Sequence, residues 1–110
     1  MRIAIPVVNQ KLSAHFGHSE KFYFFDIENN KISKKEILDP PPHAVGTIPK
    51  WVAEQKTTDI IAGGMGQMAI NLFNQALVNV HIGAQIQEPE KLVEEFINGT
   101  IQLNSNLCDH

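Results

Sequence analysis

Two histidines, His15 and His18, lie three positions apart in the segment SAHFGHSE, with Gly17 between them. Neutral imidazole is a common ligand for transition metals, and a His-x-x-His spacing in a short glycine-containing loop can direct both rings at one site. The chain ends in the letters CDH, where Cys108 offers a thiol and His110 a further imidazole. These residue types suit a transition metal or a metal–sulfur cluster.

Other candidate binding residues are two further histidines and a glycine-rich stretch. His43 follows three consecutive prolines, and His81 lies in a short apolar run. Either histidine alone is a weaker candidate than the His15 and His18 pair, because a lone loop histidine is usually only solvated. Residues 63–66 read GGMG, and we expect Gly64 and Gly66 to let the backbone approach a bulky ligand and to offer N–H donors.

The hydrophobic pattern predicts an α/β fold that begins with three strands and continues with alternating helices and strands. The expected strands are residues 2–8, 22–28, 31–38, 59–62 and 79–82. The expected helices run from an N-cap at Thr47 to about Gln55, across Met68 to Ala76, and from Glu88-Pro89 to a stop at Gly99. Asn29-Asn30 suits a tight turn, residues 39–46 must form a loop, and Met68 is expected in the core.

The predicted connections place the candidate residues at one end of the sheet. The second strand runs antiparallel to the first, and the third runs parallel to the first. The two helical crossovers then return the fourth and fifth strands parallel to the first strand as well. The carboxyl ends of four of the five strands then lie at one end of the sheet, which we call the rim. Ligands of open α/β sheets bind there. We therefore expect His15, His18, His43, His81 and the 63–66 loop to converge at the rim.

The bulk properties of the chain narrow the classes of partner. At 110 residues and 12.3 kDa it is expected to fold as one domain, residues 1–110, with a polar tail at 101–110. A net charge of −3 gives no reason to bind nucleic acid. No apolar run approaches the roughly 20 residues of a membrane span. We expect a cytoplasmic protein, monomeric or weakly homo-oligomeric, without membrane or nucleic-acid partners, and its single cysteine forms no internal disulfide.

Alternative functions remain open on the residues alone. Residues 64–69 fit the dinucleotide pattern G-x-G-x-x-A, although they follow the fourth strand and no acidic residue follows the next one. A small-molecule or nucleotide-binding regulatory module could use the 63–66 loop, and the histidines with Cys108 could form a mononuclear zinc or copper site. A protein interaction domain with incidental histidines is a further alternative. No catalytic triad is evident, and residues 2–10 contain none of the paired carboxylates with which a nuclease on a similar sheet would hold metal ions, so we predict no enzyme.

Several short motifs together resemble one protein family over the chain from the first strand to the last residue. The motifs are Ser13-x-His15-Phe16-Gly17, His43-x-x-Gly46 with Pro49-x-Trp51, DIIAGGMG at residues 59–66, and Cys108-x-His110. In combination they resemble the dinitrogenase iron-molybdenum cofactor biosynthesis family, the nitrogenase accessory factor-like proteins. The chain looks like a stand-alone, single-domain member.

The resemblance implies a ribonuclease H-like mixed sheet of five strands in the order 3-2-1-4-5, with strand 2 antiparallel and three flanking helices. It also implies a non-catalytic carrier of a labile iron–sulfur or iron–molybdenum cluster, with metallocofactor assembly proteins or an acceptor apo-protein as partners. By motif, His15 is the first cluster ligand, and Cys108 and His110 match the Cys-x-His tail. The candidate site residues are His15, Gly17, His18, His43, Gly64, Gly66, Cys108 and His110.

Overall fold

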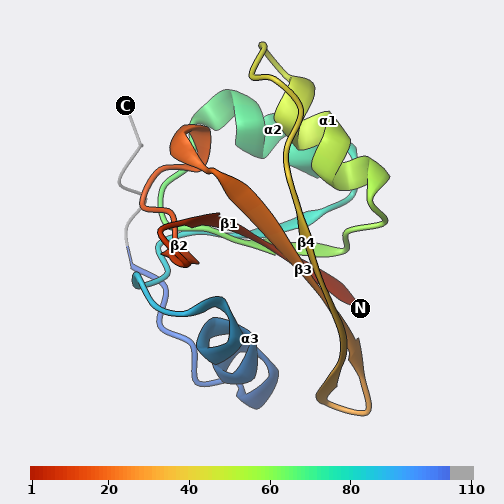
Figure 1. The fold of residues 1–110 in the computed structure, drawn as a ribbon, viewed down its shortest axis with the longest axis vertical. Coiled ribbons are helices and arrows are strands. Elements are labelled where there is room, and N and C mark those ends of the chain that lie inside the picture. The colour runs from red at the N-terminus through yellow and green to blue at the C-terminus, as the bar shows by residue number, and fades with distance from the viewer. Residues whose placement is uncertain (105–110) are drawn as a thin grey trace.

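The computed structural model describes residues 1–104, in which three helices cover the two faces of a six-stranded mixed sheet (Figure 1). The strands are β1 (Arg2–Val8), β2 (Lys11–Leu12), β3 (Lys21–Glu28), β4 (Lys31–Leu38), β5 (Asp59–Ile61) and β6 (Asn79–His81). The helices are α1 (Thr47–Glu54), α2 (Gln67–Gln75) and α3 (Pro89–Asn98), and η1 (Phe16–His18) is a 3-10 turn. The longest of these helices has 10 residues, so none within residues 1–104 could span a bilayer.

The strand directions follow the prediction, but the number of strands does not. The main path of the sheet is β4-β3-β1-β5-β6, with β3 antiparallel to both of its neighbours and β1, β5 and β6 parallel. The prediction of five strands is wrong, because β2 pairs antiparallel with β1 through Val7 and Leu12. Asn9 and Gln10 make this reversal with φ values of 53° and 65°. A two-residue strand is too short to show alternation in the sequence.

The β3–β4 hairpin confirms the tight turn predicted at Asn29-Asn30. Both asparagines have positive φ, 52° and 60°, as a two-residue turn that matches the right-handed strand twist requires. β4 is an edge strand of the sheet and exposes Lys31, Lys34 and Lys35. Lysines on an edge strand hinder the addition of a further strand.

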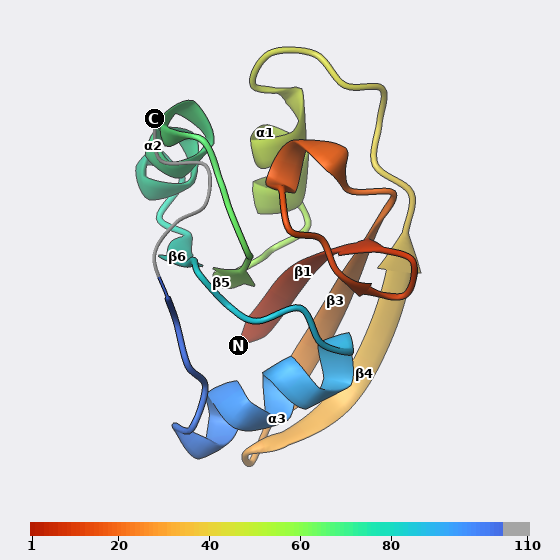
Figure 2. The ribbon, with the colours of Figure 1, turned by 90° about the vertical axis from the view of Figure 1, so that its left-hand side faces the viewer.

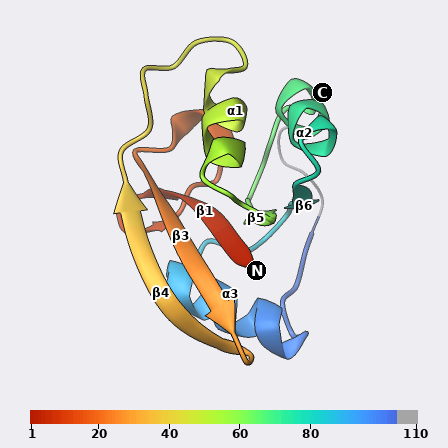
Figure 3. The ribbon, with the colours of Figure 1, turned by 90° about the vertical axis from the view of Figure 1, so that its right-hand side faces the viewer.

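The core has two layers, one on each face of the sheet. Figures 2 and 3 show α1 and α2 against one face and α3 against the other. β1 is buried on both faces, since Ala4 joins the α1/α2 layer and Ile3 and Ile5 join the α3 layer. This double burial explains why its sequence is a continuous apolar run. The aromatic residues concentrate in the first layer, where the largest fully buried side chains are Phe22, Phe24 and Phe73.

Two local predictions on the helices are wrong. α1 begins at Thr47 itself, and its N-cap is Gly46, whose φ of 76° favours glycine. Met68 is 60% exposed, because α2 turns this side chain outward and Met65, in the preceding loop, occupies the core. The last helix ends as predicted, at Gly99 with φ 73°.

A buried carboxylate, Asp59, organises the amino end of β5. One oxygen accepts the Thr58 hydroxyl at 2.7 Å, and the other accepts the Asn79 amide at 3.3 Å and lies 3.1 Å from Nε2 of His81. The His81 ring also packs against Phe96, with 4.8 Å between ring centroids. The His81 side chain therefore turns back from the rim, and the prediction that it joins the rim histidines is wrong.

Replacing Asp59 tests this cluster. In Asp59→Ala three polar side chains lose their shared acceptor, and we expect the free energy of unfolding to fall by about 1–3 kcal/mol. The matched control is Asp39→Ala, which removes an exposed carboxylate paired with Lys21 and should change stability by less than about 1 kcal/mol. Urea denaturation measures both, and equal effects would contradict a structural role for Asp59.

Candidate functional site

Two loops are joined directly at the rim. The N–H of Phe16 donates to the Gly64 carbonyl at 2.9 Å, and the N–H of Gly64 donates to the Ala14 carbonyl at 2.7 Å. These bonds attach the histidine-containing loop that precedes β3 to the glycine loop that follows β5. Both backbone groups of buried Gly64 are used in this pair. Gly64 therefore holds the two loops together, and its N–H is already occupied.

The neighbouring glycines make this contact possible and continue it across the rim. A Cβ on Gly63 would lie 3.0 Å from the carbonyl oxygens of Ser13 and Ala14, so a larger residue would push the loops apart. The N–H of Gly83 donates to the Gly63 carbonyl, and the N–H of Asn104 donates to the Gly83 carbonyl, both at 2.7 Å. The end of the described chain thus lies beside the glycine loop.

A buried phenylalanine explains the sequence His-Phe-Gly-His. Phe16 makes edge-to-face contacts with Phe22 and Phe73, each with 5.7 Å between ring centroids. The residues around Phe16 in the same turn, His15, Gly17 and His18, are exposed. The two imidazole rings are 5.5 Å apart, with their planes at 68°. Phe16 therefore anchors the turn in the core while the pair of imidazoles stays at the surface.

A pocket of about 290 Å³ lies next to this turn and draws on three loops of the rim. Gly17, His43 and Gly66 line it, one from each loop. Its apolar wall consists of Phe16, Ala44, Ile48, Pro49, Met68, Ala69 and Leu72. Sequence reasoning missed this wall because it assigned Met68 to the core. The pocket volume is close to the lower end of the ~300–1,000 Å³ typical of small-molecule sites.

The structure thus separates the predicted site residues into groups. His15 and His18 are neighbours on one turn, and Gly17, His43 and Gly66 line the pocket. Gly64 is bonded to the histidine-containing loop through its backbone. Cys108 and His110 lie outside the described residues. Among residues 1–104, no three His, Cys, Asp or Glu side chains are close enough together to hold a metal ion. The rim therefore offers an open set of imidazoles beside an apolar pocket, which differs from a closed four-ligand metal site.

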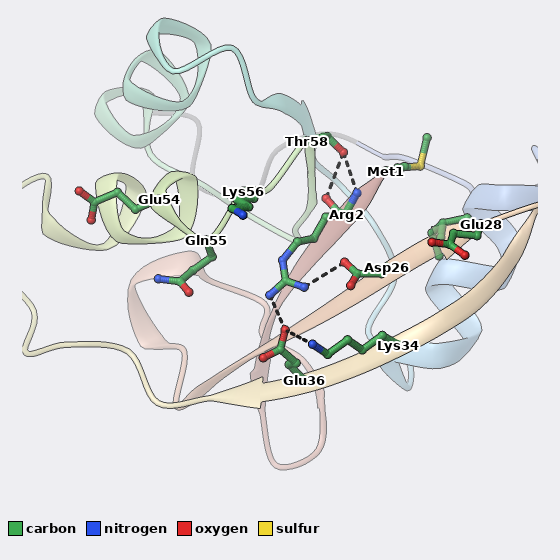
Figure 4. A pocket seen from close by; sticks show the side chains of 11 residues that line it. Met1, Arg2, Asp26, Glu28, Lys34, Glu36, Glu54, Gln55, Lys56 and Thr58 are labelled. Atoms are coloured by element: carbon green, nitrogen blue, oxygen red, sulfur yellow. Dashed lines mark hydrogen bonds and ion pairs between the residues drawn. The ribbon is translucent and has the colours of Figure 1, made fainter.

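A larger pocket lies elsewhere, at the amino end of β1 (Figure 4). It has a volume of about 590 Å³, and four of the charged residues that line it pair with one another. Arg2 donates to Asp26 and Glu36, each at 2.9 Å, and Lys34 lies 3.6 Å from Glu36. Burial lowers the pKa of Arg2, but its bonds to the two carboxylates outweigh burial and raise it. These ion pairs hold β1, β3 and β4 together and include none of the rim residues.

Glycine substitutions test the contact between the two loops. We expect Gly63→Ala to reduce the free energy of unfolding by about 1–3 kcal/mol, because its Cβ would meet backbone atoms that cannot yield cheaply. The control is Gly17→Ala, whose Cβ would have no atom within 4 Å, and its stability should stay the same or rise by up to about 1 kcal/mol. If thermal unfolding gives the same stability for both variants, the close contact at Gly63 does not contribute to the stability of the fold.

Comparison with known proteins relates the whole described fold to one family. The model of the family described as dinitrogenase iron-molybdenum cofactor matches residues 1–99. A protein of Methanocaldococcus jannaschii, MJ0580, is 33% identical over 107 residues, which cover 93% of this chain and 90% of the relative.

Solved structures agree with this relationship. The crystal structure of PH0822 superposes with a TM-score of 0.88 at 28% identity, over 94% of this chain and 95% of the other. The apo form of the orange protein of Desulfovibrio gigas gives a TM-score of 0.76 at 17% identity, over 96% and 93% of the two chains, and shows a shared fold. The chain therefore belongs to the dinitrogenase iron-molybdenum cofactor family.

Proposed function

We propose that the chain binds an iron–sulfur or iron–molybdenum cluster precursor at the rim and carries it to an acceptor protein during metallocofactor assembly, without catalysing a reaction. The observation that carries this proposal is the joining of the two loops, which places the exposed pair His15 and His18 beside the pocket that holds His43. The family to which the chain belongs is named for the iron-molybdenum cofactor, which supports the class of cargo.

The proposed ligands differ in how they would reach the cargo. His15 and His18 bring two imidazoles from one turn, and His43 brings a third from the wall of the pocket. Gly17 and Gly66 have open space at their Cβ positions, so a bulky cluster could approach the backbone there. The amide groups at the start of α2, which has no side-chain cap, would favour the negative charge of a sulfide-rich cluster.

Cys108 and His110 complete the proposed ligand set. Asn104 is bonded to Gly83 at the rim, four residues before Cys108 in the chain. Four extended residues span at most about 14 Å, which limits how far Cys108 can lie from Asn104. A thiolate binds the iron of a metal–sulfur cluster more strongly than a neutral imidazole does.

The open arrangement suits a carrier better than a resident cofactor site. Residues 1–104 supply no closed group of three metal-ligating side chains, so part of the coordination would come from the cluster itself or from another source. The apolar wall of the pocket would limit access of water to the cargo while it is bound. The apolar wall would favour retention of the cargo during transfer, and the small number of protein ligands would favour its release at the acceptor.

The glycine loop is less suited to a nucleotide than its sequence indicates. A phosphate-binding loop needs free backbone N–H groups, whereas the N–H of Gly64 already donates to Ala14. The loop is committed to holding the histidine turn, so the nucleotide-binding module is the weaker alternative.

The test is to reconstitute the protein with iron, sulfide and molybdate under anaerobic conditions and to measure retained metal, sulfide and visible absorption after desalting. We expect His15→Ala to lose affinity for the cluster by more than about tenfold, since even a residue that only orients a ligand contributes ~10–100-fold. The control is His81→Gln, which replaces a histidine away from the rim with a side chain that can still donate to Asp59.

The outcomes separate the competing functions. Equal cluster retention by His15→Ala and the parent protein would exclude His15 as a ligand. A colourless protein with stoichiometric zinc and no sulfide would indicate a mononuclear site. Thermal stabilisation by a nucleotide in the absence of metal would favour the nucleotide-binding module.

A further inference from the structure

Eleven of the described residues line the pocket at the rim, and only two of them have a side chain that contains a possible metal donor atom. These two residues are His43, with its imidazole, and Met68, with its thioether. The other nine are glycine, alanine, proline, leucine, isoleucine and phenylalanine, whose side chains contain no nitrogen, oxygen or sulfur. The side chains of the pocket therefore offer one nitrogen ligand and one sulfur ligand against an apolar wall.

Met68 is available to a ligand because of how α2 is oriented. It is the second residue of the helix and is 60% exposed, while Met65 in the preceding loop fills the core. A single exposed methionine is ordinary by itself. Met68, however, lines the same pocket as His43, and its unbranched side chain ends in a polarizable sulfur that adapts to a bound group.

His43 lies on a loop with restricted backbone freedom. Residues 40–42 are three prolines, each of which fixes its own φ, so the loop has fewer conformations to lose when His43 binds an ion. The loop leads into α1, and Figures 2 and 3 show α1 beside α2 on one face of the sheet. The fold therefore holds the segments that carry His43 and Met68 in one layer.

The two donor atoms select a class of metal ion. Thioether sulfur is a soft ligand that favours Cu(I), and imidazole also binds copper. The lining has no side-chain oxygen of the kind that Mg²⁺ and Ca²⁺ prefer, and no Lys or Arg that would repel a cation. Both donors are neutral, so a monovalent ion would leave less uncompensated charge beside the apolar wall than a divalent ion.

We propose that His43 and Met68 form a binding site for a soft monovalent metal ion of the Cu(I) class in the pocket at the rim. The site needs neither sulfide nor a cluster, so it does not depend on the proposed carrier function. It also differs from a zinc or copper site built from the histidines and Cys108, because its sulfur ligand is the thioether of Met68.

Titration of the metal-free full chain with Ag(I), a soft monovalent ion, tests this proposal. The methyl signals of the three methionines and the ring signals of His43 are followed by nuclear magnetic resonance. We expect the Met68 and His43 signals to shift together and to saturate. Met1 is the matched internal control, because it is also 60% exposed but lines the pocket at the amino end of β1, and its signal should not follow.

Substitutions show whether the two side chains bind the ion together. His43→Ala should weaken Ag(I) binding at Met68 at least about tenfold, and Met68→Leu, which keeps the apolar volume, should weaken binding at His43 in the same way. His81→Gln, away from the rim, should change neither. The titration is repeated in Cys108→Ser, so that an ion held by the thiol is not counted, and the Met68 shift should persist.

The outcomes decide this site and the carrier function separately. Equal shifts of Met1 and Met68, a Met68 shift that His43→Ala leaves unchanged, or a shift that is lost in Cys108→Ser would each overturn the site. None of these results would affect retention of iron and sulfide after reconstitution. Saturable Ag(I) binding by His43 and Met68 in a protein that retains no cluster would support the site and contradict the carrier function.

Discussion

The backbone pair between the Ala14–Phe16 segment and Gly64 is the constraint on which the rim depends. It continues the parallel association of β1 and β5 beyond the sheet and joins two loops that the chain separates by nearly fifty positions. The absence of a side chain at Gly63 is what permits the approach. Once the loops are joined, Phe16 enters the aromatic layer, the two imidazoles beside it remain outside, and the pocket forms between the turn and α2.

The sequence was sufficient to predict the elements and the direction of the strands, because both follow from apolar periodicity and from the connections. It was insufficient where tertiary contacts decide. β2 is a two-residue strand that exists only through its pairing with β1. Met68 and His81 have types and positions that suit a core and a rim, respectively, but Met65 fills the core and Asp59 binds the His81 side chain.

For the candidate site as well, one part could be predicted from the sequence and another part could not. Histidines at the carboxyl ends of strands can be placed at one end of a sheet from connectivity alone, and His15, His18 and His43 do lie there. The role of Gly64 could not be predicted, since a glycine that contacts a ligand and one that contacts another loop have the same sequence signature. The apolar wall of the pocket also depends on which face α2 turns outward, and periodicity gives no such orientation.

The lysines on β4 have a consequence for how the protein behaves when it is crowded. An open sheet edge is a template on which a second molecule can add a strand, and repeated addition leads to fibres. Because β4 carries Lys31, Lys34 and Lys35, approach of an identical edge would bring rows of positive charge together. Strand addition at this edge is therefore disfavoured, and the protein is protected against growth into fibres from this side of the sheet.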